Sequence, residues 1–187
     1  MFRVFIALDI TDELKSELAR LIAGFQSAGA DVKWVGPEGL HLTLKFLGSV
    51  EEARLDGIRA ALKAVAARSG SFGFRCAGLG AFPDMRKPQV LWAGILGDQG
   101  NLVRLARRTD ESLAALGFPQ AERPFSPHLT LGRIRSPKGL RGLTEVYSRA
   151  PFTPPGTVSA DKIVLYKSAT GPGGSVYEAL DTFPLNG

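Results

Sequence analysis

The tetrapeptide His41-Leu-Thr-Leu44 occurs a second time as His128-Leu-Thr-Leu131, and these are the only two histidines among 187 residues. For ordinary composition, a chance second copy behind the one remaining histidine has odds on the order of one in a thousand. Successive side chains of a strand point to opposite faces. Each motif is therefore predicted to form a strand whose histidine and threonine share one face, while its leucines are buried on the other.

The sequence around the two motifs repeats in the same order. A strand-like run over 3–8 reappears over 91–96, and a polar turn and an amphipathic helical pattern follow each copy. After the motifs come, in the same order in both copies, a helical stretch (51–68 and 137–149) and a further strand (72–79 and 163–167), and a last strand-like run covers 175–180.

This repeat predicts an α+β fold with two pseudo-symmetric lobes, each an antiparallel sheet backed by helices. The lobes should face each other across a central cleft that carries the two His-x-Thr-x motifs. We expect one bilobal domain over residues 1–187, with an internal repeat over about 3–80 and 91–168. Long glycine-rich hairpin loops leave open which strand belongs to which lobe.

The composition indicates the kind of binding partner and the cellular compartment. The 23 Lys and Arg residues against 18 Asp and Glu residues give a net charge of +5, which favours encounter with polyanions such as RNA. The basic residues are scattered, however, and most are expected on solvated helix faces. The single cysteine, Cys76, cannot form a disulfide within the chain, and Asp9 interrupts the apolar start of the sequence. We expect a reduced, cytoplasmic protein.

The paired motifs suit in-line displacement at phosphorus. One imidazole can protonate a leaving oxygen while the other deprotonates the incoming one, and two threonine hydroxyls can hold the non-bridging oxygens. A metal site is a poorer explanation, because neither tetrapeptide brings a Cys, Asp or Glu at ligand spacing. The chain also lacks a phosphate-binding Gly-Lys-Ser/Thr loop and a dinucleotide fingerprint. We expect catalysis by His41, Thr43, His128 and Thr130 without a metal or another cofactor.

Three stretches, over 2–9, 33–48 and 124–133, resemble the bacterial and archaeal 2'-5' RNA ligase family of the two-histidine phosphoesterases. The resemblance runs nearly end to end, with Gly39 standing where relatives often carry Asn. It implies hydrolysis of RNA-terminal 2',3'-cyclic phosphodiesters to 2'-phosphomonoesters, with a reverse 2'-5' ligation. It also implies that His41 donates a proton and that His128 accepts one.

Alternation along the motif strands suggests two further charged contacts. Lys45 continues the face of His41 and Thr43, so it could bring charge to the phosphate or reach water at the rim. Arg133 matches an arginine of the family, but strict alternation turns it away from the cleft unless a bulge at Gly132 reverses it. The same alternation predicts that Phe46 is buried.

Three aromatic residues flank the motifs and could stack on an RNA base, with core packing as the alternative: Trp34, Phe125 and Tyr166. Two other functions remain open. One is a phosphodiesterase for small cyclic nucleotides or 2',5'-linked oligoadenylates, and the other is an RNA-end binder without turnover. The second has no need of two titratable groups. We expect RNA ends as the partner, no membrane association, and a monomer without an obligate protein partner.

Overall fold

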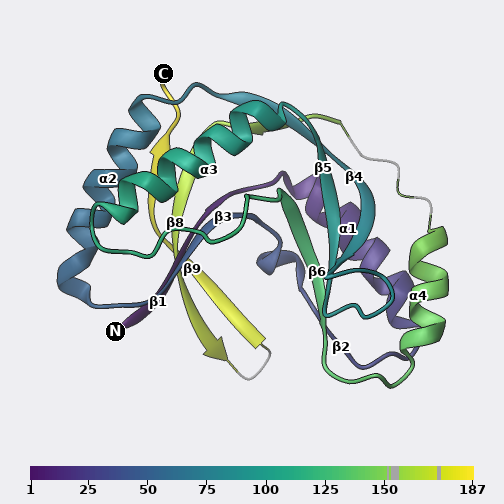
Figure 1. The fold of residues 1–187 in the computed structure, drawn as a ribbon. Coiled ribbons are helices and arrows are strands. Elements are labelled where there is room, and N and C mark those ends of the chain that lie inside the picture. Colours follow the sequence, from purple (N-terminus) through teal and green to yellow (C-terminus); the bar gives the residue numbers. More distant parts are fainter. Residues whose placement is uncertain (151, 153–155, 172–173) are drawn as a thin grey trace.

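The computed structural model describes residues 1–150, 152, 156–171 and 174–187, and in them two antiparallel sheets combine with four α-helices (Figure 1). The predicted α+β class is confirmed. The strands are β1 (Phe2–Leu8), β2 (Val32–Trp34), β3 (Leu42–Val50), β4 (Phe72–Phe82), β5 (Val90–Gly97), β6 (His128–Ile134), β7 (Val158–Ala160), β8 (Lys162–Gly171) and β9 (Gly174–Pro184). The helices are α1 (Asp12–Gln26), α2 (Leu55–Ala67), α3 (Gln99–Ala114) and α4 (Leu140–Arg149), with short 3-10 turns at Pro37–Gly39 and Glu52–Arg54.

The first helix of each half begins where its sequence predicts. The Thr11 hydroxyl accepts the backbone N–H of Leu14 at the start of α1, and the Asp98 carboxylate accepts that of Asn101 at the start of α3. Such side-chain caps satisfy donors that the first helical turn leaves unpaired. Both helices then bury one apolar face, so each half starts with the same strand, cap and amphipathic helix.

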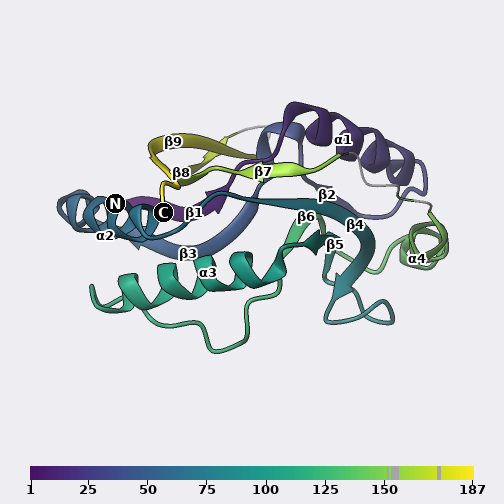
Figure 2. The same ribbon diagram turned by 90° about the horizontal axis from the view of Figure 1, so that it is seen from above.

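The strands form two sheets with related orders. The first sheet runs β3-β1-β8-β9 and the second runs β2-β6-β5-β4-β7. Helices α2 and α3 lie against the first sheet, whereas α1 and α4 lie together beside the second (Figures 1 and 2). The orders β3-β1-β8 and β6-β5-β4 correspond strand for strand, which gives the two lobes their similarity.

The lobes are not the two halves of the chain, because the halves exchange elements. Strand β4, from the first half, pairs with β5 in the second sheet, and β8, from the second half, pairs with β1 in the first. Strand β2 also crosses, to pair with β6. The helices follow the same rule, since α1 comes directly after β1 yet contacts α4.

Strand β3 contains a β-bulge within its motif. Thr43 lies opposite Ala7 and Lys45 lies opposite Ile6, so Leu44 is an extra residue without a partner in β1. A bulge of this kind reverses the alternation of the side chains that follow it. Lys45 and Phe46 therefore point to the faces opposite to those that alternation predicts, and a second register shift at Leu47 restores the alternation after it.

Strand β6 contains the equivalent bulge. Thr130 lies opposite Trp92 and Gly132 lies opposite Leu91, which leaves Leu131 as the extra residue. In both motifs the second leucine is the bulged one. Ala7 and Trp92 occupy equivalent positions, because each lies opposite the threonine of a motif. The alignment of the sequence runs 3–8 and 91–96 had placed Val4 at the position of Trp92.

The bulge in β3 carries Lys45 away from the face of His41, so the placement predicted for Lys45 fails. Its ammonium donates to the Asp110 carboxylate on α3 and, at 2.7 Å, to the Pro119 carbonyl. The Lys45 side chain is only 8% exposed. The buried ion pair fastens β3 to α3 and to the segment that follows α3.

Along the described ranges, no helix is both long enough and apolar enough to cross a membrane.

The Lys45→Met variant should lower the free energy of unfolding. Removing one partner of a fully buried pair costs about 3–5 kcal/mol, and we expect about 2 kcal/mol here because Asp110 is partly exposed and keeps the Ala121 N–H. Urea denaturation of the purified protein measures this loss. Arg141→Met, which removes the solvent-exposed pair with Glu145 on α4, is the matched control and should leave stability unchanged. Equal stability of Lys45→Met and the unmodified protein would contradict the structural role.

Candidate active site

A cavity of about 290 Å³ lies where the two motif strands approach each other. The first sheet supplies His41 and Thr43 to its wall, and the second supplies Thr130 and Arg133. Strands β3 and β6 are in contact although they belong to different sheets. His41, Thr43 and Thr130 of the two predicted motif faces therefore line one space, whereas His128 is not among the residues of its wall.

The two bulges place Phe46 and Arg133 at equivalent positions of the cavity wall. Arg133 faces inward, as the resemblance implied and as a bulge near Gly132 permits. Phe46 is 65% exposed and lines the cavity, so the prediction that it is buried was wrong. A Cβ atom on Gly132 would lie 2.7 Å from Val32 Cγ1 in β2, which explains a glycine at this point of the bulge.

Aromatic rings hold His41 on two sides. Its imidazole stacks on Phe5, with ring centroids 4.6 Å apart, and meets the edge of Tyr177 at 5.2 Å. Tyr166 stacks on Phe5 at 5.2 Å, and its hydroxyl donates to the Asp9 carboxylate. The predicted residue Tyr166 thus lies beside His41, with its hydroxyl already engaged.

The charge state of His41 is set mainly by burial, which lowers its pKa to about 4. The Asp9 carboxylate and a hydrogen bond to the Gly39 carbonyl raise the pKa, and the positive charge of Lys15 lowers it slightly further. Burial acts in this direction because a low-dielectric surrounding disfavours the charged form. His41 is therefore neutral near pH 7 unless an anion enters the cavity.

His128 has a fixed orientation. Its Nδ1 lies 2.7 Å from the Ser126 carbonyl, and because a carbonyl only accepts hydrogen bonds, Nδ1 carries a proton. Nε2 is then the nitrogen that gains or loses a proton. Gly39 and Ser126 stand two residues before His41 and His128, so the two motifs orient their rings in the same way.

The pKa of His128 is also below the ordinary value. Burial is the main cause, the Ser126 hydrogen bond opposes it, and the nearby guanidinium of Arg133 lowers the pKa further. The Phe82 ring meets the imidazole edge-on, with centroids 4.9 Å apart. His41 therefore has a carboxylate that favours its protonated form, and His128 has a guanidinium that favours its neutral form.

Two predicted aromatic contacts lie elsewhere in the fold. Trp34 stacks with Phe25 of α1 at 6.1 Å and packs against the core, and Phe125 also packs against the core. Neither lines the cavity. The pairing of β2 with β6 turns Trp34 toward α1, and that pairing could not be read from the sequence.

Sequence reasoning missed several residues of the site. Alternation over 3–8 places Arg3 and Phe5 on one face, and both line the cavity, so this signal was present in the sequence. No motif marks Tyr177, which reaches the cavity from β9. Asp9 follows directly after β1 and had been noted only as a break in an apolar run.

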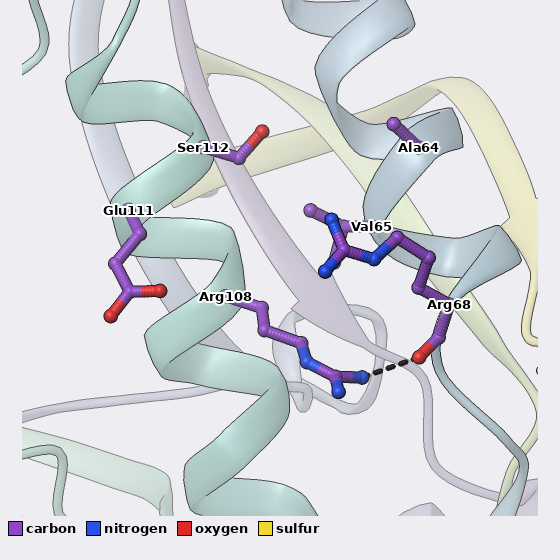
Figure 3. Close-up of a pocket in the computed structure, with 6 residues that line it drawn as sticks. All are labelled: Ala64, Val65, Arg68, Arg108, Glu111 and Ser112. Atoms are coloured by element: carbon purple, nitrogen blue, oxygen red, sulfur yellow. Dashed lines mark hydrogen bonds between the residues drawn. The ribbon is translucent and has the colours of Figure 1, made fainter.

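A second hollow of about 290 Å³ lies between α2 and α3 and contains neither histidine (Figure 3). Its most prominent side chain, Arg108, donates to the Arg68 carbonyl and to the Ser69 hydroxyl at the end of α2. These bonds satisfy a helix C-terminus, which is a structural role. Within the part of the chain that the structure describes, no three His, Cys, Asp or Glu side chains are grouped to hold a metal ion.

Comparison with known proteins identifies the family. The model of the LigT-like phosphoesterases matches residues 8–92 and 96–177, and each matched stretch contains one His-Leu-Thr-Leu motif. The chain belongs to the LigT-like phosphoesterase family. This assignment agrees with the resemblance found in the sequence.

Relatives and solved structures match almost the whole chain. Proteins named RNA 2',3'-cyclic phosphodiesterase are 32% identical in Methanothermobacter thermautotrophicus, over 98% of both chains, and 35% identical in Methanocaldococcus jannaschii, over 95% of this chain and 98% of the relative. The crystal structure of TT0787 from Thermus thermophilus aligns with a TM-score of 0.79 at 29% identity, over 99% of this chain and 98% of that one. LigT of E. coli in complex with 3'-AMP aligns with a TM-score of 0.76 at 27% identity, over 100% and 99%.

Titration by NMR should separate the two histidines. We expect the His41 ring to titrate at about pH 4 and the His128 ring below its ordinary value, because burial lowers both pKa values. Asp9→Asn should lower the pKa of His41 further by removing the carboxylate, and inorganic phosphate should raise the pKa of both rings. His41→Ala and His128→Ala assign the two signals. Titration of both rings near 6.5, without any effect of phosphate, would contradict this description of the cavity.

Proposed function

We propose that this protein hydrolyses RNA-terminal 2',3'-cyclic phosphodiesters to 2'-phosphomonoesters, with His41 and His128 as acid and base and without a metal or nucleotide cofactor. The observation that carries the proposal is that His41, Thr43, Thr130 and Arg133 line one cavity where the two motif strands are in contact, with His128 two residues before Thr130 on the second of these strands. The relatives named RNA 2',3'-cyclic phosphodiesterase support the substrate class.

In the proposed reaction, His128 Nε2 takes a proton from water as the water oxygen bonds to phosphorus. The bond from phosphorus to O3' breaks, and protonated His41 donates its proton to that oxygen. A 2'-phosphate and a free 3'-hydroxyl result, and the two imidazoles exchange protons with solvent before the next turnover. Each transfer needs a group that can change its charge near the working pH, as imidazole does.

The assignment of the two roles rests on the family resemblance, and the charges around the rings support it. Asp9 favours the protonated form that a donor needs, and Arg133 favours the neutral form that an acceptor needs. The anionic substrate offsets the burial of His41, because a phosphate beside an imidazole favours its charged form. Substrate binding thus helps to charge the acid.

The threonines and Arg133 bind the non-bridging oxygens. Hydroxyl and guanidinium donors stabilise the negative charge that develops as the oxygen attacks, and a guanidinium can hold two such oxygens at once. The same groups serve the reverse reaction, a 2'-5' ligation in which the proton transfers run backwards. We include this ligation in the proposal as a minor activity.

The proposal also covers the working unit. Because both motifs of the cavity come from one chain, a monomer is sufficient and no protein partner is required. Because the cavity needs both sheets, residues 1–187 act as a single bilobal domain, with repeats over about 3–80 and 91–168. The single buried cysteine fits a reduced, cytoplasmic setting.

Incubation with an oligonucleotide ending in a 2',3'-cyclic phosphate should yield a 2'-phosphate in the presence of EDTA. The product is identified by chromatography against 2'- and 3'-phosphate standards. His41→Ala and His128→Ala should each abolish turnover, because each removes one proton transfer. Activity that disappears with EDTA and returns with a divalent ion would sink the metal-free mechanism.

An aryl phosphodiester, whose leaving group departs without protonation, separates the two roles. It should rescue His41→Ala far more than His128→Ala. Rescue of His128→Ala instead would reverse the assignment, and full activity of both variants on the cyclic phosphate would exclude acid and base catalysis by this pair.

Thr43→Val and Thr130→Val should each lower kcat roughly a hundredfold, because loss of one donor to a developing oxyanion costs about 3 kcal/mol. Steady-state kinetics on the cyclic phosphate measures the loss. Thr144→Val on α4, where the hydroxyl donates to the Arg141 carbonyl, is the matched control and should keep full activity. If kcat and KM of both motif variants equal those of the control, the threonine hydroxyls do not bind the phosphate.

A further inference from the structure

The cavity extends well beyond the two motifs, along the face of the first sheet. Thr43 and Ala7 lie side by side at its inner end, and Phe46 and Phe5 form the next row. The rows follow the strand spacing, about 3.4 Å per residue, so neighbouring rows on one face stand about 7 Å apart. Phe5 is buried and Phe46 is 65% exposed, so a ligand that extends outward from the reacting phosphate would meet the Phe46 ring.

A polar row lies beyond the aromatic one. Arg3 stands two residues before Phe5 on the same face of β1, and the register places Ser168 of β8 directly opposite Arg3. Ser175 of β9 borders the same end of the cavity. One guanidinium and two hydroxyls therefore line the cavity beyond the aromatic row.

Arg3 has no charge partner within the described ranges. It is exposed, it takes part in none of the ion pairs there, and no described acidic side chain lines the cavity. A guanidinium with neighbouring hydroxyls is a strong donor set for phosphate oxygens. Two described guanidinium groups therefore line the cavity, Arg133 from β6 and Arg3 from β1.

We propose that Arg3, with Ser168 and Ser175, binds the phosphodiester on the 5' side of the terminal nucleotide, so that the preferred substrate is an RNA chain and not a cyclic mononucleotide. This inference rests on the proposed function. The cyclic phosphate lies at the motifs, the terminal nucleoside lies along the exposed Phe46 ring, and the next phosphodiester reaches Arg3. A cyclic mononucleotide ends there in a neutral 5'-hydroxyl and leaves Arg3 without an anion.

The test compares three substrates: adenosine 2',3'-cyclic phosphate, the dinucleotide ApA with a 2',3'-cyclic phosphate, and the same dinucleotide with an uncharged methylphosphonate linkage. Both dinucleotides carry a 2'-O-methyl group on the upstream nucleotide. We expect kcat/KM for the charged dinucleotide to exceed the other two by about tenfold or more, the usual range for a hydrogen bond to a charged group. The advantage should appear in KM, because this contact is made equally in the ground state and the transition state.

Arg3→Gln should lower about tenfold the ratio of kcat/KM for the charged dinucleotide to kcat/KM for the other two substrates. The methylphosphonate dinucleotide should then react as fast as the charged one. The salt dependence of KM for the charged dinucleotide should also weaken by one phosphate contact, a change of about 0.7 in the slope of log KM against log salt. Arg141→Gln on α4 removes the same charge from a 95% exposed side chain outside the cavity, and it should leave the ratio unchanged.

Equal kcat/KM values for all three substrates, or an unaltered ratio in Arg3→Gln, would overturn the subsite while leaving the proposed hydrolysis intact. Absence of turnover with every substrate would overturn the proposed function and the subsite together. An equal fall of the ratio in Arg141→Gln would assign the preference to net charge and also overturn the subsite.

Discussion

In β3 and β6 the leucine after each motif threonine takes an extra place in its strand, and this constraint decides what the cavity contains. Without the bulges at Leu44 and Leu131, alternation would turn Arg133 outward and bring Lys45 in. With them, Lys45 pairs with Asp110, and Phe46 and Arg133 both line the cavity. The same β-bulge in both motif strands thus places different side chains, Phe46 and Arg133, at equivalent positions of the two lobes.

The packing that fixes the imidazoles also keeps them uncharged. Phe5 and Tyr177 hold His41, and Phe82 meets His128, so both rings have few orientations to lose when substrate binds. Burial in the same surroundings lowers the pKa of each ring. Binding of an anion and uptake of a proton are therefore thermodynamically coupled in this cavity. An empty cavity holds a poor acid, and a filled one holds a better acid.

The sequence predicts most of the local structure and part of the site. The amphipathic helices that follow β1 and β5 and the strands of the two motifs follow from patterns within one segment, and the structure has them. The bulges could not be predicted, because an unpaired residue is defined only by the register of two distant strands. The predictions for Lys45 and Phe46 were both wrong because of the bulge at Leu44. The exchange of β4 and β8 depends on long-range pairing in the same way.

That exchange has a mechanical consequence. The chain passes from one sheet to the other between β1 and β2, again before β3, before β4 and before β8. Domains that move about a hinge are connected by few chain segments, whereas several chain segments connect these two lobes. We therefore expect the two lobes to keep a fixed separation on either side of the cavity. A substrate should then enter a cavity whose width is already set, without a movement of one lobe toward the other.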